Sequence, residues 1–303
     1  MADTTIEWAR RPRTDGSLMP GYTFNPWWGC VRVSPACDHC YADSFAHRLG
    51  LDLWTANGPR RFFGEKHWQE PERWNAKAAK LGEQHLVFCA SMADVGEKRA
   101  DLDPWREKLW DLIARTPHLV WLLLTKRPQY LRKVVPWRGR WPANVWFGAT
   151  VESPDYLWRA EELLEADVGV RFISYEPAVG PPAFSDVLGP DRVNWLLIGS
   201  ESGVQSRPMP LAWAHEAIRQ ARTMGASPLV KQLDAGLLSL GRKGVAVKDM
   251  ERLPADLRVR RATFALGNRI AGCPCETHVR ADCAWCMGEL PEDVCACHGS
   301  DGE

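Results

Sequence analysis

The chain has 303 residues, which suits one large α/β core with an appendage. Lys plus Arg and Asp plus Glu number 38 each, so no global basic field draws the protein to nucleic acid, and any polynucleotide must bind a local patch. No apolar run approaches the roughly 18 residues of a membrane span, and residues 1–13 are too polar for a secretory signal. We therefore expect a cytoplasmic protein with no membrane partner.

Three cysteines near the N-terminus, Cys30, Cys37 and Cys40, have the spacing Cys-x6-Cys-x2-Cys. Four cysteines saturate zinc or an iron–sulfur cluster, whereas three leave one metal position open for water, substrate or cofactor. The trio therefore predicts a metal with an open position. A zinc knuckle completed by His39, Cys89 or a distant residue is the alternative. A disulfide is disfavoured in a chain without an export signal.

Residues 50–80 interleave aromatic and basic side chains. The aromatic ones are Trp54, Phe62, Phe63, Trp68 and Trp74, and the basic ones include Arg60, Arg61, Lys66 and Arg73. Such a segment can stack nucleobases and neutralise phosphates. It can equally be an insertion that packs its rings onto the core, and both interpretations stay open at this point.

Short apolar runs alternate with helical patterns through most of the remaining chain. The runs cover 86–91, 119–125, 145–150, 170–174, 195–199 and 228–232, and helical patterns cover 103–115, 129–134, 154–166 and 210–224. This alternation predicts a parallel sheet, whose strands are buried on both faces. With a first strand near residues 22–27, we expect about six strands, which favours a partial, open barrel over a closed eight-stranded one.

Polar side chains follow the apolar runs, at the strand ends where ligands gather in parallel α/β folds. They are Ser91 and Asp94, Thr125 and Lys126, Thr150 and Glu152, Ser174 and Glu176, Ser200 and Glu201, and Lys231 and Gln232. Polar groups at six strand ends predict one shared site. For each glutamate, the alternative is an ion pair with a neighbouring Arg.

The C-terminal part has a different composition. Residues 242–261 hold seven Lys or Arg and three Asp or Glu, which suits contact with phosphates but also a solvated surface. Six cysteines follow, Cys273, Cys275, Cys283, Cys286, Cys295 and Cys297, with His278 and His298 nearby. So many thiols in a short segment favour metal over disulfides, and both zinc and an auxiliary iron–sulfur cluster accept them. We expect a catalytic domain over residues 1–240, and a basic linker with a metal-binding tail over 241–303.

The cysteine run, followed by Tyr41 and Ala42, resembles the variant cluster motif of radical S-adenosylmethionine (SAM) enzymes, specifically a phage and prophage family of three-cysteine-motif proteins. Further similar segments follow in the same order: Thr125-Lys126-Arg127-Pro128, Gly148-Ala149-Thr150-Val151-Glu152, Ser174-Tyr175-Glu176-Pro177, Ile198-Gly199-Ser200-Glu201-Ser202-Gly203 and Arg207-Pro208-Met209. The resemblance covers about residues 4–235 and not the tail. The commoner superfamily spacing, Cys-x3-Cys-x2-Cys, has a shorter first gap.

The resemblance implies a partial (β/α)6-type TIM barrel of the radical SAM kind. It also implies a 4Fe-4S cluster on Cys30, Cys37 and Cys40, SAM on the open iron, and an electron donor of the flavodoxin or ferredoxin type. Tyr41 matches the aromatic position near adenine, unless it only packs in the first helix. Candidates for the SAM ammonium and ribose are Glu152, Glu176 and Glu201, and candidates for the SAM carboxylate are Ser91, Thr125 and Lys126.

Two classes of function follow. The first is a radical SAM enzyme of the isomerase, mutase or lyase type. The phage association suggests that its substrate is a hypermodified thymidine in DNA, such as a glycinyl-thymidine, in the host cytoplasm. A radical SAM lyase that repairs damaged DNA is the alternative within this class. The second class is a zinc-stapled nucleic-acid-binding or adaptor protein without catalysis.

Overall fold

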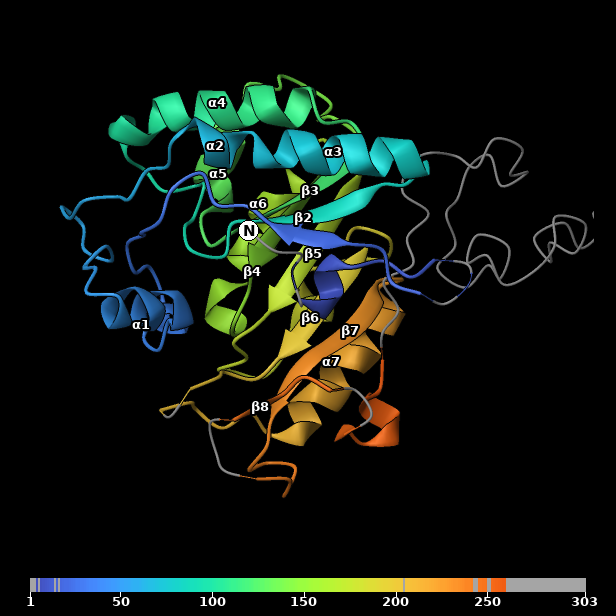
Figure 1. Ribbon diagram of the computed structural model, residues 1–303. Helices are drawn as coiled ribbons and strands as arrows, with labels where there is room; N and C mark the ends of the chain where they lie inside the picture. Colours follow the sequence, from blue (N-terminus) through green and yellow to red (C-terminus); the bar gives the residue numbers. More distant parts are fainter. Residues whose placement is uncertain are drawn as a thin grey trace, which may run out of the picture.

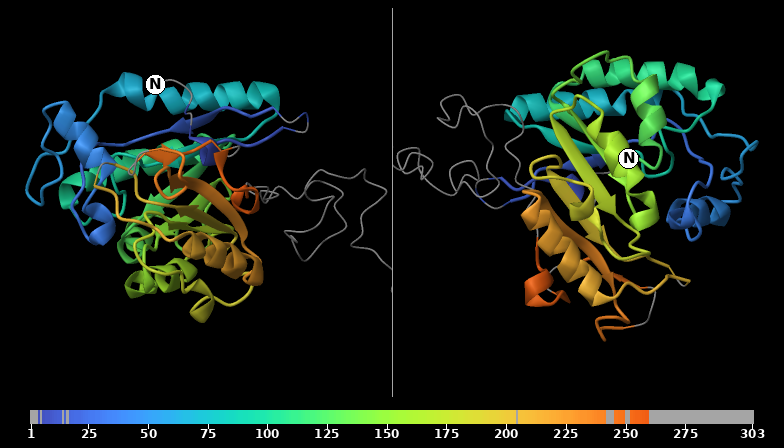
Figure 2. Two further views of the ribbon diagram at one scale, coloured as in Figure 1. Left: turned by 90° about the horizontal axis from the view of Figure 1, so that it is seen from below. Right: turned by 180° about the vertical axis from the view of Figure 1, so that it is seen from behind.

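The computed structural model describes residues 4, 6–13, 15, 17–203, 205–241, 245–249 and 252–259, and these form a mixed α/β architecture. One curled sheet, an open half-barrel, lies at the centre with helices on its outer face (Figures 1 and 2). The strands follow the sequence order: β1 (Gly21–Thr23), β2 (His85–Cys89), β3 (Leu119–Thr125), β4 (Val145–Thr150), β5 (Val170–Tyr175), β6 (Trp195–Gly199), β7 (Ser227–Asp234) and β8 (Ala246–Val247). The first seven are parallel, and β8 is antiparallel to β7.

The helices lie in the connections between strands. They are α1 (Tyr41–Arg48), α2 (Glu65–Trp68), α3 (Glu70–Leu81), α4 (Asp103–Ala114), α5 (Pro128–Val134), α6 (Trp158–Leu164) and α7 (Leu211–Thr223). Short 3-10 segments are η1 (Glu7–Ala9), η2 (Pro35–Cys37), η3 (Ala100–Leu102), η4 (Pro154–Tyr156), η5 (Phe184–Asp186) and η7 (Ala255–Leu257). None of the helices in the described ranges combines the length and the apolar character of a membrane span.

The predicted alternation of strands and helices is confirmed, but the expected number of strands is corrected. Seven parallel strands form instead of about six, because β1 and all six later apolar runs pair in one sheet. The first strand is also shorter than expected, since it ends at Thr23. Beyond it, the Asn25 side chain accepts a hydrogen bond from the backbone nitrogen of Met92 (2.7 Å) and ties the chain to the end of β2.

The strands bury side chains on both faces, as their continuous apolar runs require. In β2, Leu86 and Phe88 belong to the inner core, whereas Val87 and Cys89 pack in the outer core with the helices. In the segment 50–80, the packing interpretation holds for Trp54, Trp68, Trp74 and Arg60, which are buried, while Arg61 and Phe62 stay exposed.

Two predicted features lie wholly or partly outside the described residues. All six tail cysteines, Cys273 to Cys297, fall there, and so do 242–244, 250–251 and 260–261 of the basic segment. The predicted boundary near residue 240 therefore stays a prediction, as does the metal-binding tail.

The short η1 segment fills the inner face of the half-barrel and contacts β1, β2 and β7. Its Trp8 ring packs edge to face on Phe88 (4.6 Å between centroids) and on Trp195 (6.1 Å). Gly21 in β1 admits this segment, because a Cβ at that position would lie 1.8 Å from the backbone oxygen of Ala9. The close approach of η1 to the first strand thus requires glycine at position 21.

We expect Gly21→Ala to lower the free energy of unfolding by about 1–3 kcal/mol, because the added methyl group must displace η1 from the sheet. Gly169→Ala is the matched control, since a Cβ there meets nothing within 4 Å. Urea unfolding of both variants measures the difference. Equal stability of the two would contradict the packing of η1 against Gly21.

Candidate functional site

A pocket opens at the carboxyl ends of the strands, where the predicted polar residues gather. Its lining includes Cys30, Cys37, Cys40, Tyr41, Ser91, Asp94, Thr125, Lys126, Thr150, Ser174, Glu176, Ser200, Glu201, Lys231 and Gln232. These residues come mainly from two places. One is the cysteine loop, residues 24–40 between β1 and α1, and the other is the set of strand ends from β2 through β7. Of the strand-end residues predicted to share one site, only Glu152 lies outside this lining.

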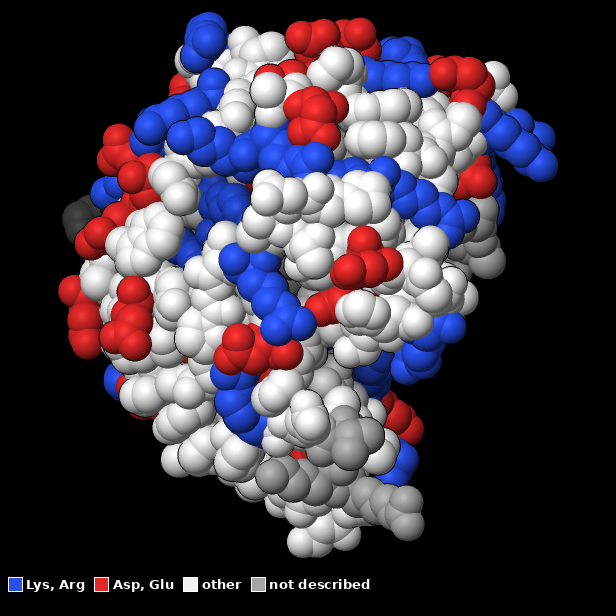
Figure 3. All heavy atoms as spheres, turned by 90° about the vertical axis from the view of Figure 1, so that its left-hand side faces the viewer, with Lys and Arg blue, Asp and Glu red and all other residues white. Residues whose placement is uncertain are grey.

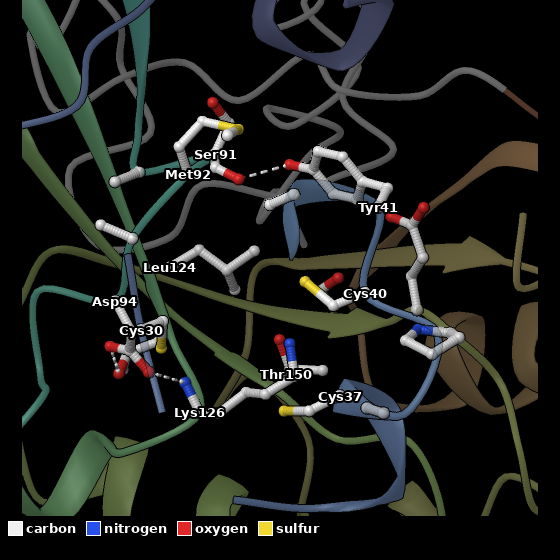
Figure 4. Close-up of a pocket in the computed structure, with 18 of the residues that line it drawn as sticks. Cys30, Cys37, Cys40, Tyr41, Ser91, Met92, Asp94, Leu124, Lys126 and Thr150 are labelled. Atoms are coloured by element: carbon white, nitrogen blue, oxygen red, sulfur yellow. Dashed lines mark hydrogen bonds between the residues drawn. The ribbon is translucent and has the colours of Figure 1, made fainter. Parts of the chain in front are cut away.

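The three cysteines of the predicted trio lie on one wall of the pocket. Cys30 follows β1, Cys37 ends η2 and Cys40 directly precedes α1. All three are free, half-buried thiols, and their sulfur atoms turn toward the same space (Figure 4). The chain between β1 and α1 therefore presents three soft ligands to one cavity.

Thiols that line a pocket can serve two kinds of metal site. Among the described residues, no three His, Cys, Asp or Glu side chains lie close enough together to hold a single metal ion. In a zinc site, all ligands bond to one centre. An iron–sulfur cluster is larger, and it takes each thiolate on a separate iron atom. The three pocket-facing thiols are the residues of the described chain that could hold such a group.

The two named candidates for a fourth ligand differ in their place, since His39 lines the pocket and Cys89 does not. His39 has its Nδ1 atom 2.9 Å from Glu201 Oε2. Cys89 is fully buried in β2 and packs in the outer core instead of lining the pocket. Of the described residues, only the trio supplies thiols to the pocket.

Arg127, at the start of α5, holds the first part of the cysteine loop. Its guanidinium donates hydrogen bonds to the carbonyl of Val31 (2.6 Å) and to Asp94 Oδ2 (2.6 Å), and lies 3.5 Å from Cys30 Sγ. Asp94 in turn accepts hydrogen bonds from Thr125 Oγ1 (2.5 Å) and the Lys126 backbone nitrogen (3.1 Å, Figure 4). The ends of β2 and β3 are thereby joined to the residue next to the first cysteine.

Arg207 holds the second part of the same loop. Its guanidinium donates to Glu201, to the carbonyl of Pro35 (2.7 Å) and to Asp38 (3.3 Å). His39 approaches the same Glu201 carboxylate from the loop side. Burial alone would raise the pKa of Glu201, but the hydrogen bonds from Arg207 and His39 keep that pKa below its usual value.

The three predicted glutamates have different partners. Glu152 is fully buried and pairs with Arg159 (2.7 Å), so the ion-pair alternative describes it. Glu201 lines the pocket but is also bound by Arg207. Glu176 lines the pocket and accepts both of its contacts from Lys231 Nζ (2.6 and 2.7 Å), on strand β7. Glu176 and Lys231 together offer one negative and one positive group to a ligand.

Tyr41 and Ser91 meet at the edge of the pocket. The Tyr41 hydroxyl donates to the Ser91 carbonyl (2.7 Å), which ties the first residue of α1 to the end of β2 (Figure 4). Tyr41 is 55% exposed, so its ring borders the opening and is not core packing. Lys126 also borders the pocket and is half-buried.

The metal-free thiol of Cys30 is protonated at neutral pH. Burial raises its pKa to about 12, although the Arg127 guanidinium acts in the opposite direction. Metal ligation needs the thiolate, so binding at this position must release a proton.

Arg127 and Arg207 were not predicted as site residues, although both belong to the similar segments. Their neighbours in sequence, Lys126 and Pro208, give no sign of a role in holding the loop. The only sequence signal is their position in the connections after strands, since Arg127 lies two residues after β3 and Arg207 eight residues after β6. Trp8, which lines the pocket from the N-terminal segment, gave no signal at all.

The fold and the site define a class: a mixed α/β half-barrel with a cysteine-lined pocket at its strand ends. The chain belongs to the family described as protein of unknown function DUF5131, whose model matches residues 3–248. The match includes the cysteine loop and all eight strands, and it ends before the cysteine-rich tail. Comparison with curated proteins and with solved structures gives no match.

We expect Arg207→Gln to loosen the cysteine loop, because the variant loses charge-assisted hydrogen bonds to Pro35, Asp38 and Glu201. Hydrogen–deuterium exchange of residues 31–39 should become at least about tenfold faster, as expected from the loss of a hydrogen bond to a charged group. The control is Arg219→Gln, since Arg219 is exposed on α7 and pairs only locally with Glu216. Unchanged exchange rates in Arg207→Gln would show that Arg207 is not needed to hold the cysteine loop.

The lowered pKa of Glu201 also predicts a pH dependence. A carboxylate with a lower pKa in the folded state stabilises the protein fully above its unfolded pKa, and this contribution is lost as pH falls through the folded pKa. Glu201→Gln should therefore be less stable at neutral pH, and its stability should fall less steeply on acidification. Urea unfolding at a series of decreasing pH values measures how the free energy of unfolding of each protein depends on pH. The same dependence in both proteins would contradict the lowered pKa of Glu201.

Proposed function

We propose that the protein is a radical SAM enzyme, in which Cys30, Cys37 and Cys40 hold a 4Fe-4S cluster. The observation that carries the proposal is the wall of three thiols that face one strand-end pocket, in a loop fixed by Arg127 and Arg207. A scaffold has no need for thiols that open onto a cavity shared with the polar residues of six strand ends. When bound, such a cluster would supply one electron to SAM, whose C5′–S bond would break to give methionine and a 5′-deoxyadenosyl radical able to take hydrogen from a substrate.

The remaining pocket residues can bind different parts of a SAM molecule. Tyr41 offers an exposed ring at the pocket edge, where a nucleoside base can stack. The Glu176–Lys231 pair can exchange its internal contacts for the ammonium and carboxylate of an amino-acid group, such as the methionyl end of SAM. Ser91 and Lys126 are further candidates for the carboxylate. Glu152, with its buried Arg159 partner, orders the loop after β4 instead of binding the ligand.

The half-barrel supports the finer description as a partial TIM barrel of the radical SAM kind. Parallel strands in sequence order, with helical crossovers outside and polar residues at the carboxyl ends, are the arrangement that this class requires. The seventh parallel strand extends the sheet beyond the six of the predicted barrel. We place the electron donor, of flavodoxin or ferredoxin type, outside this chain.

The proposed substrate is a hypermodified thymidine in DNA, such as a glycinyl-thymidine, and the proposed reaction is a rearrangement. The support is the phage association of the resemblance together with a pocket that opens to the surface beside exposed aromatic side chains. A DNA-repair lyase would use the same residues, and analysis of the product distinguishes the two. The adaptor alternative would place a structural zinc on the trio, and analysis of iron, sulfide and zinc distinguishes it from the cluster.

The first experiment tests the cluster and its chemistry. We expect protein purified without oxygen to contain iron and sulfide and, after reduction in the presence of SAM, to release 5′-deoxyadenosine. Cys37→Ala should lose this product and the iron of the N-terminal site, because only two ligands remain, while metal in the C-terminal tail is retained. Iron, sulfide and zinc analysis with chromatography of the products measures all three quantities.

Cys89→Ala is the matched control, because it also removes one thiol but from the outer core and not from the pocket. It should keep both the iron and the cleavage of SAM. If the unmodified protein is iron-free yet active, or if Cys37→Ala still cleaves SAM, the proposed ligands are wrong.

A further inference from the structure

An aromatic–arginine surface lies beside the pocket and consists of Trp28, Phe45, Arg48, Arg61 and Phe63. The Trp28 ring packs edge to face on Phe45 (6.0 Å between centroids) and on Phe63 (5.7 Å). The Arg61 guanidinium lies over Trp28 (4.9 Å) and Phe63 (5.6 Å), and that of Arg48 lies over Phe45 (5.8 Å). Three separate segments thus build one layer of rings and cations.

This surface is open and carries unneutralised positive charge. Phe45 is 38% exposed, and Arg48 and Arg61 are both exposed. Within the described ranges, neither arginine forms an ion pair with a carboxylate, in contrast to Arg60 next in sequence, which pairs with Glu97. Lys and Arg side chains gather in a band across the face of the molecule on which α1 lies (Figures 1 and 3).

Helix α1 connects the aromatic–arginine surface to the pocket. Tyr41 and Phe45 are one helical turn apart and therefore lie on the same side of α1. Tyr41 lines the pocket, whereas Phe45 belongs to the surface. Trp28 is two residues before Cys30, so the surface also adjoins the cysteine loop.

We propose that the aromatic–arginine surface binds a single strand of nucleic acid and leads one of its bases past Tyr41 into the pocket. Single strands alternate flat bases with anionic phosphates, and proteins bind them with exposed rings and unpaired arginines. An acidic protein partner would use the cations but has no requirement for an exposed aromatic side chain such as Phe45. The inference rests on the proposed function for its DNA substrate, but the binding itself does not require SAM or a cluster.

The test is fluorescence anisotropy of a labelled thymidine oligomer of about ten nucleotides, a typical length for one such site, with the full chain over a series of salt concentrations. Arg61→Gln should weaken binding and reduce the slope of log affinity against log salt by about 0.7, the value for one lost phosphate contact on a single strand. Phe45→Ala should weaken binding about tenfold, as expected for one lost stacking contact, without changing the slope.

The controls match each substitution in kind and lie on the opposite side of the molecule. Arg219→Gln removes an exposed arginine of α7, and Leu81→Ala removes an exposed apolar side chain from the end of α3 (Figure 1). Both should leave affinity and slope unchanged, and melting curves should show that all four variants are folded.

Three results would overturn the inference: no binding of the oligomer, equal effects of control and surface variants, or binding of an acidic flavodoxin in place of the oligomer. SAM cleavage without oligomer binding would reject this surface alone. Oligomer binding in a protein that never cleaves SAM would reject the proposed function and leave the surface in place.

Discussion

Two carboxylate–arginine pairs at the strand ends hold the cysteine loop, and the geometry of the site depends on them. Asp94 and Glu201 each bind a guanidinium that also donates to a loop carbonyl, of Val31 and of Pro35 respectively. A largely buried ion pair is stable only when its remaining hydrogen-bonding groups are satisfied. Here the loop carbonyls satisfy them, so the carboxylates fix the loop through the arginines. Contacts within the protein therefore help to direct the three thiols toward one cavity.

The sheet explains why such pairs form where they do. Parallel strands must be covered on both faces, and in this chain the helices cover the outer face while Trp8 and its neighbours fill the inner face. With both faces occupied, the carboxyl ends of the strands are left for polar groups. The pocket is thus a consequence of the packing, and the cysteine loop forms one of its walls.

The sequence allowed the sheet to be predicted because apolar runs and helical patterns are local signals. β3, β4 and α7 lie within a residue or two of their expected limits. The partners of charged residues could not be predicted in this way, since Arg207 binds Pro35 across 172 positions of the chain. For the same reason, Glu152 and Glu201 could not be distinguished in the sequence. In the structure, Glu152 forms a buried ion pair with Arg159, whereas Glu201 borders the pocket.

The arginines of this chain have two different roles, although its net charge is zero. Arg60, Arg127, Arg159 and Arg207 are committed to carboxylates and hold loops in place. Arg48 and Arg61 lie over aromatic rings and, within the part of the chain that the structure describes, are paired with no carboxylate. A net charge of zero is compatible with a local cationic surface, because the negative charges that balance Arg48 and Arg61 in the total lie elsewhere in the chain. The free cations adjoin the cysteine loop, which is where a polynucleotide substrate would have to be held.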